Sequence, residues 1–131
     1  SGKTIDLPMV QFYGGTDMFL PGSEDVLRDI VPLLKANPEL KIEIAGHINA
    51  PFRTEAQLEK WEKDLSCNRA KAIYDFLLKN NIDEERLAYK GYNNSQMVFP
   101  EARNFKDQAL NRRVEIRILD TGEVISVKDG N

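Results

Sequence analysis

The sequence has little of several residue types that define common kinds of protein. It contains one cysteine and one histidine, which excludes an intrachain disulfide, a multi-cysteine zinc site and most histidine-based metal centres. Its net charge is −3, whereas nucleic-acid-binding surfaces carry a basic excess. No apolar run approaches the ~20 residues of a membrane-spanning helix. We therefore expect no cofactor, no nucleic-acid partner and no insertion of this domain into a membrane.

What is present is typical of one globular domain. The chain has 131 residues, of which 41% are apolar and 30% charged, so we expect a single domain over residues 1–131. We place its core at residues 5–119 and expect a turn and a short hairpin strand within 120–131. No secretory signal is found, and Ser1 and Gly2 are typical of a cloning remnant.

The hydrophobic pattern alternates between strand and helix periods. Apolar alternation predicts strands, and apolar stripes at helical spacing predict helices. The expected strands are 5–13, 40–46, 87–91 and 113–119, and the expected helices are 23–37 and 55–80. Residues 92–109 are expected to be irregular or weakly helical.

This element order predicts the fold class. The order β-α-β-α-β-β corresponds to an α/β (α+β) two-layer sandwich, with two main helices on one face of a small mixed sheet. The opposite face would expose charged residues to solvent, namely Lys41, Glu43, Arg113, Glu115 and Arg117.

Arg69 interrupts an apolar helix stripe. It lies four residues from both Leu65 and Ile73, so its side chain projects with theirs toward the core. An arginine cannot be neutralised there, because its guanidinium stays protonated at any physiological pH. The guanidinium must reach water, pair with an internal carboxylate, or bind an anionic ligand. For an arginine kept for a ligand, we expect Arg69→Leu to leave stability unchanged or slightly raised.

Five short motifs occur along the chain. They are FLPGS at 19–23, GHIN at 46–49, LSCNRA at 65–70, KGY at 90–92 and NRRVE at 111–115. In this order and spacing they resemble motifs of the OmpA-like peptidoglycan-binding family, the C-terminal domain of outer-membrane protein A. The resemblance covers about residues 5–119 and agrees with the fold expected from periodicity.

The resemblance implies noncovalent binding of the peptidoglycan peptide stem, commonly at diaminopimelate. Such a domain would tether an envelope protein or complex to the cell wall, in the periplasm of a Gram-negative-type bacterium and as part of an outer-membrane-associated protein. The family's arginine corresponds to Arg69, whose planar fork suits a carboxylate. The family's aspartate, which takes the ligand's ammonium, corresponds to Asn49.

Asn49 is the main departure from the family pattern. An amide keeps an acceptor but loses the charge, which costs on the order of 1 kcal/mol, or about ten-fold in affinity. Ile48 replaces the family's threonine, and Glu62 stands where an asparagine is common. A carboxylate such as Glu62 could take over the ammonium. Arg112 has the strand parity of buried Val114, so it is expected to point toward the helices and the site.

Two other functions are compatible with the same fold. An OmpA-like domain that has lost wall binding would serve as a protein–protein interaction or structural module for other envelope proteins. In that case Arg69 would be saturated by an internal carboxylate, with no pocket beside it. A hydrolase built on Ser66 and His47 would need an orienting carboxylate and an oxyanion hole, which the spacing does not supply. We therefore expect no enzymatic activity.

Overall fold

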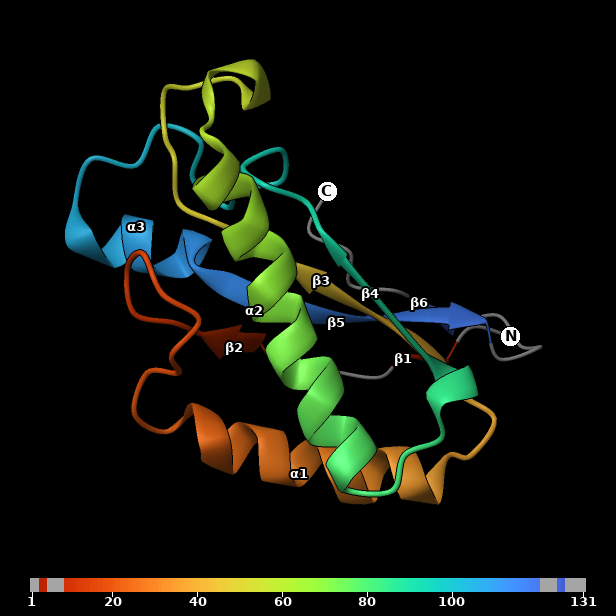
Figure 1. Cartoon of the computed structure of the whole chain (residues 1–131). Coiled ribbons are helices and arrows are strands. Elements are labelled where there is room, and N and C mark those ends of the chain that lie inside the picture. Colours follow the sequence, from red (N-terminus) through yellow and green to blue (C-terminus); the bar gives the residue numbers. More distant parts are fainter. Residues whose placement is uncertain (1–2, 5–8, 121–124, 127–131) are drawn as a thin grey trace.

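The computed structural model describes residues 3–4, 9–120 and 125–126 (Figure 1). The helices are α1 (Ser23–Ala36), α2 (Lys60–Lys79) and α3 (Phe105–Asn111), with short 3₁₀ turns at Glu55–Gln57 and Glu84–Arg86. The strands are β1 (Lys3–Thr4), β2 (Met9–Gln11), β3 (Lys41–Gly46), β4 (Leu87–Gly91), β5 (Arg113–Asp120) and β6 (Ile125–Ser126).

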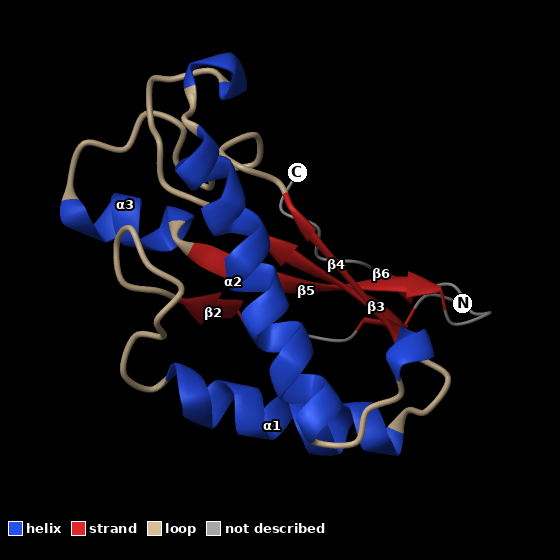
Figure 2. Cartoon of the chain, viewed as in Figure 1, coloured by secondary structure: helices blue, strands red, loops and turns tan. Residues whose placement is uncertain are grey.

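The main sheet is mixed and has the order β2-β5-β3-β4. Strand β5 is antiparallel to both β2 and β3, while β3 and β4 are parallel. Helices α1 and α2 pack on one face of this sheet (Figure 2). The predicted two-layer α/β sandwich is therefore confirmed.

The predictions for the two ends of the chain have different outcomes. The predicted hairpin strand is wrong, because β6 pairs in parallel with β1 and not with β5. Residues 5–8 of the first predicted strand, the predicted turn at 120–122 apart from Asp120, and the first two residues lie outside the described residues.

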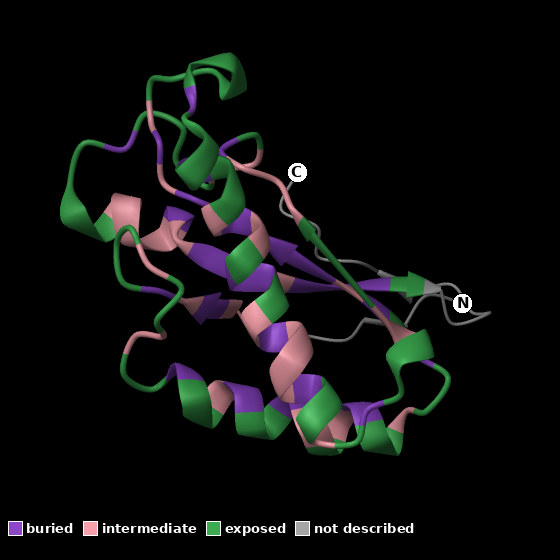
Figure 3. Ribbon diagram, viewed as in Figure 1, coloured by how far each residue is buried: buried purple, intermediate pink, exposed green. Residues whose placement is uncertain are grey.

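One continuous apolar core lies between the helices and the sheet (Figure 3). It combines α1 residues at helical spacing, α2 residues and the inward-facing strand positions, all of them buried: Leu27, Ile30, Leu34, Ile73, Leu77, Ile42, Ile44, Val114, Ile116 and Ile118. This burial of apolar surface is the main stabilising term of the fold. None of the helices in the described part of the chain is long and apolar enough to cross a bilayer.

Helix α2 lies unusually close to the sheet at two glycines. A Cβ atom added to Gly46 would lie 1.9 Å from the backbone oxygen of Ser66, and one added to Gly91 would lie 2.5 Å from the backbone nitrogen of Cys67. Ser66 and Ala70 are fully buried at this contact. The small residues bring the helix backbone to the end of β3, where the candidate site begins.

The segment expected to be irregular contains helix α3. Its first turn is capped by Asn104, whose Oδ1 accepts a hydrogen bond from the backbone nitrogen of Asp107. The helix has 7 residues, which is too short to show a helical apolar stripe. Helix α3 ends at Asn111, and β5 begins two residues later at Arg113.

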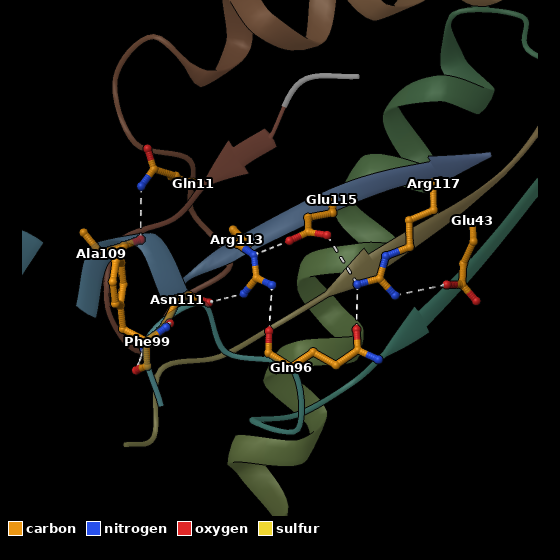
Figure 4. A network of polar contacts seen from close by, with 9 residues as sticks. All are labelled: Gln11, Glu43, Gln96, Phe99, Ala109, Asn111, Arg113, Glu115 and Arg117. Atoms are coloured by element: carbon orange, nitrogen blue, oxygen red, sulfur yellow. Dashed lines mark hydrogen bonds and ion pairs between the residues drawn. The ribbon is translucent and has the colours of Figure 1, made fainter. Parts of the chain in front are cut away.

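The charged face of the sheet is solvated only in part: Lys41 is exposed as predicted, whereas the two arginines of β5 are buried. Arg113 is fully buried and Arg117 is 6% exposed, because the chain after β4 covers them through Gln96 (Figure 4). Glu115 accepts from Nε of Arg113 at 2.6 Å and from Nη2 of Arg117 at 3.3 Å. Strand parity gave the correct face, but it carries no information on the loop that covers it.

Candidate functional site

A small cavity of about 50 Å³ lies at the end of α2 that faces the loop after β3. Segments far apart in sequence line it: Gly15, Ile48, Asn49, Trp61, Glu62, Leu65, Arg69 and Arg112. A water molecule needs about 10–15 Å³ on this measure, so the cavity accommodates a group the size of a carboxylate. The structure brings all five predicted site residues to this one place.

Arg69 is held by backbone carbonyls. Its Nε donates to the oxygen of Thr16 at 2.8 Å, Nη1 to that of His47 at 2.9 Å and Nη2 to that of Tyr13 at 3.1 Å. The guanidinium also lies over the ring of Phe12, 5.3 Å from its centroid. These contacts fix the orientation of the arginine, since they come from two separate segments, the chain that follows β2 and the residue that follows β3.

The charge of Arg69 is not matched by a carboxylate. The side chain is 1% exposed, and no acidic group of the described residues lies within ion-pair distance of it. Burial and, to a lesser extent, the nearby charge of Arg112 lower the pKa of Arg69 to about 10, against a weaker opposing effect of Asp17. A buried cation in this state gains from a bound anion.

Arg112 contributes a second cation to the cavity wall. Its guanidinium lies over Gly14, where an added Cβ would be 3.3 Å from Nε. The side chain is half-buried and makes no hydrogen bond or salt bridge to the residues described. Its position at the cavity agrees with the parity prediction, and its N–H groups are available to a ligand.

Asn49 is tied to the end of α3 by a hydrogen bond. Its Oδ1 accepts a hydrogen bond from Nδ2 of Asn111 at 2.9 Å. Asn111 is itself fully buried and bonds to both backbone polar groups of Phe99. Ile48 beside it is 3% exposed and forms an apolar part of the wall.

Glu62 lines the cavity but is already paired. Its two carboxylate oxygens accept from Nη1 and Nη2 of Arg53 at 2.8 and 2.7 Å, and Oε1 also accepts from the backbone nitrogen of Glu59. These bonds hold the pKa of Glu62 below its usual range, with the Arg53 hydrogen bond as the largest cause. Glu62 therefore anchors the first turn of α2, and its charge is compensated within the protein.

Several site features were not found from the sequence. The carbonyl partners of Arg69 leave no signal in residue identity, because every residue carries a backbone carbonyl. Trp61, which the sequence motifs did not assign to the site, is 56% exposed and lines the cavity. Asn111 is the first residue of the NRRVE motif. The motif gave no indication that Asn111 positions the side chain of Asn49.

The residues considered for a hydrolase do not form a catalytic pair. The hydroxyl of Ser66 donates to the backbone oxygen of Lys63 and contacts Oδ1 of Asn93, both at 3.0 Å. Neither ring nitrogen of His47 hydrogen-bonds to a described residue, and the ring stacks on Tyr92.

The fold and the buried-arginine cavity define an OmpA-like domain. The model of the OmpA family matches residues 11–112, and the chain belongs to that family.

Solved structures of other proteins have a similar fold. The chain resembles the periplasmic domain of MotB from Helicobacter pylori, with 17% identity, a TM-score of 0.68 and coverage of 86% of this chain and 71% of that one. It also resembles the peptidoglycan-associated lipoprotein from Burkholderia pseudomallei, with 18% identity, a TM-score of 0.69 and coverage of 85% and 89%. At these identities the likeness concerns the fold.

A curated relative shares sequence over a limited region. The photosystem I P700 chlorophyll a apoprotein A2 of Gloeobacter violaceus is 31% identical over 101 residues. This match covers 73% of the present chain but 11% of that protein, so the likeness is confined to a small part of it.

Proposed function

We propose that the cavity binds a carboxylate of the peptidoglycan peptide stem and so tethers a parent envelope protein or complex to the cell wall. The observation that carries this proposal is the convergence of Arg69 and Arg112 on one cavity without a paired carboxylate among the described residues. A planar guanidinium held in place binds a carboxylate with charge-assisted hydrogen bonds, which are about twice as strong as neutral ones. Family membership and the name of the Burkholderia lipoprotein support the same ligand.

This function places the domain in the periplasm, as part of an outer-membrane-associated protein of a Gram-negative-type bacterium. The fold shared with the MotB periplasmic domain supports that location. The domain's role there is noncovalent binding, and the cavity residues supply recognition rather than a nucleophile or general base.

The alternative, an interaction module without wall binding, required that Arg69 be neutralised by an internal carboxylate and that no pocket lie beside it. Arg69 instead bonds to three carbonyl oxygens, and a cavity lies next to it. Both observations favour ligand binding.

The test is cosedimentation of the domain with purified peptidoglycan sacculi. Arg112→Gln is the most informative variant, because Arg112 has no side-chain hydrogen bond to a described residue and its loss leaves the fold's contacts intact. Arg28→Gln is the matched control, since Arg28 is an exposed arginine on α1 paired with Asp25. We expect Arg112→Gln to reduce the bound fraction and Arg28→Gln to leave it unchanged. Wild-type protein that stays in the supernatant, or equal binding by both variants, would contradict the proposal.

A further inference from the structure

The direction of the Asn49 side-chain amide is fixed by its neighbours. The backbone nitrogen of Phe99 donates to Oδ1 of Asn111 at 2.9 Å, and Nδ2 of Asn111 donates to the backbone oxygen of Phe99 at 2.9 Å. A backbone N–H only donates and a backbone carbonyl only accepts, so the amide of Asn111 has one orientation (Figure 4). The atom of Asn49 that receives Nδ2 of Asn111 at 2.9 Å is therefore its oxygen.

This arrangement leaves the amide nitrogen of Asn49 for a ligand. Nδ2 of Asn49 makes no hydrogen bond within the described part of the chain, while the residue lines the cavity. An aspartate at this position would offer a second, charged oxygen, but Asn49 offers two N–H donors instead. The change therefore replaces an acceptor by a donor, which is more than a loss of charge.

The other polar groups of the cavity that are free to meet a ligand are also hydrogen-bond donors. Arg69 and Arg112 supply N–H donors and two positive charges, and the carboxylate of Glu62 is already paired with Arg53. An ammonium group entering here would meet two cations, and the oxygen of Asn49 already accepts from Asn111. A carbonyl oxygen at the same place would accept a hydrogen bond from Nδ2 of Asn49.

We infer that this site selects a carboxylate beside a neutral amide carbonyl over a carboxylate beside a free ammonium. In a peptidoglycan stem, these two situations correspond to a diamino acid whose side-chain amine is acylated, as in a cross-link, and one whose amine is free. The inference rests on the proposed function and specifies which form of the stem the site takes. Asn49 is its specificity-determining residue, and Asn111 is a positioning residue that acts through Asn49.

The experiment compares two probes by calorimetric titration. One is a stem tripeptide ending in diaminopimelate with a free side-chain amine, and the other is the same peptide with that amine acetylated. The wild-type domain should bind the acetylated peptide more tightly than the free-amine peptide. Asn49→Asp should shift the ratio of the two affinities by about ten-fold toward the free-amine peptide, since it restores a charge-assisted contact.

The control variant is Asn68→Asp, which makes the same chemical change on the exposed side of α2, one residue before Arg69. It should leave the ratio of affinities as in the wild type. Equal affinities of the wild type for the two peptides, a wild-type preference for the free-amine peptide, or a ratio that Asn49→Asp does not change would overturn the inference and leave the proposed function standing. If neither peptide binds at millimolar concentration and sacculi are not bound either, the proposed function itself fails.

Discussion

Arg69 donates a fully buried hydrogen bond from Nη1 to the backbone carbonyl of His47, with a length of 2.9 Å. The bond joins the middle of α2 to the residue that follows β3. Together with the bonds to Tyr13 and Thr16, it gives Arg69 a structural task in addition to the proposed ligand contact. The sequence-based expectation of a dispensable side chain at this position therefore has to be revised.

The first prediction is that Arg69→Leu lowers the free energy of unfolding by about 2–4 kcal/mol, because three carbonyls lose charged donors and one of them is fully buried. Arg112→Leu should change stability by less than about 1 kcal/mol, since it removes no hydrogen bond to a described residue. Urea unfolding of the two variants measures the difference. Equal destabilisation by both would contradict the distinct roles given to these arginines.

The second prediction concerns pH and His47, the single histidine of the chain. Burial, and then the charges of Arg113 and Arg117, lower the pKa of His47 from 6.5 to about 2. Below pH 6.5 the unfolded chain therefore binds a proton that the folded protein does not, and stability falls as the pH falls. From pH 6.5 to 4.5 the loss from this group is about 2–3 kcal/mol.

His47→Phe tests this contribution, because it keeps an aromatic ring against Tyr92 and removes the titrating group. The free energy of unfolding, measured across this pH range, should fall less steeply for the variant than for the wild type. Parallel profiles would show that His47 takes up a proton in the folded state.

The third prediction concerns the close contact between α2 and β3. Gly46→Ala places a methyl group 1.9 Å from the backbone oxygen of Ser66, and backbone atoms cannot move aside as a flexible side chain can. We expect destabilisation of about 3 kcal/mol or more. Gly14→Ala is the control, because its added methyl group meets only the flexible side chain of Arg112 at 3.3 Å. Thermal unfolding of both variants measures the contrast, and similar melting temperatures would contradict the prediction.

The fourth prediction concerns Glu115, which bridges Arg113 and Arg117 beneath the chain after β4. Glu115→Gln leaves two buried cations short of a counter-charge, and breaking such a buried pair typically costs about 3–5 kcal/mol. Asp64→Asn removes an exposed pair with Lys60 and should cost at most about 0.5 kcal/mol. Denaturant unfolding distinguishes the two cases, and a small effect of Glu115→Gln would mean that Glu43 and Gln96 satisfy the arginines without it.

Sequence periodicity predicted the layers of the fold because burial repeats with the period of each element. Strand β4 has the predicted bounds, and α1 and α2 lie within the predicted helices. Periodicity failed where burial comes from a loop, as at Arg113 and Arg117, and where a helix is too short to repeat, as in α3. The parallel pairing of β6 with β1 depends on contacts between distant segments, which local patterns do not encode.

The candidate site was predicted through residue chemistry and motif resemblance. These brought Asn49, Arg69 and Arg112 to attention, and all three line the cavity. They did not reveal which atoms are already occupied. The pairing of Glu62 with Arg53 and the orientation of Asn49 depend on distances between side chains, and both change the ligand that the site would take.

The order of the strands also has a consequence for biosynthesis. Strand β5 lies between β2 and β3, although it follows both in the chain. A ribosome that has released α1, β3, α2 and β4 has therefore delivered two strands whose shared neighbour does not yet exist. Because pairings between distant segments form only after their loops close, the nascent chain cannot complete the sheet until residues 113–120 emerge. Until then the unpaired edges of β2 and β3 need protection from aggregation, and a chain that stops before Arg113 lacks the strand that joins β2 to β3.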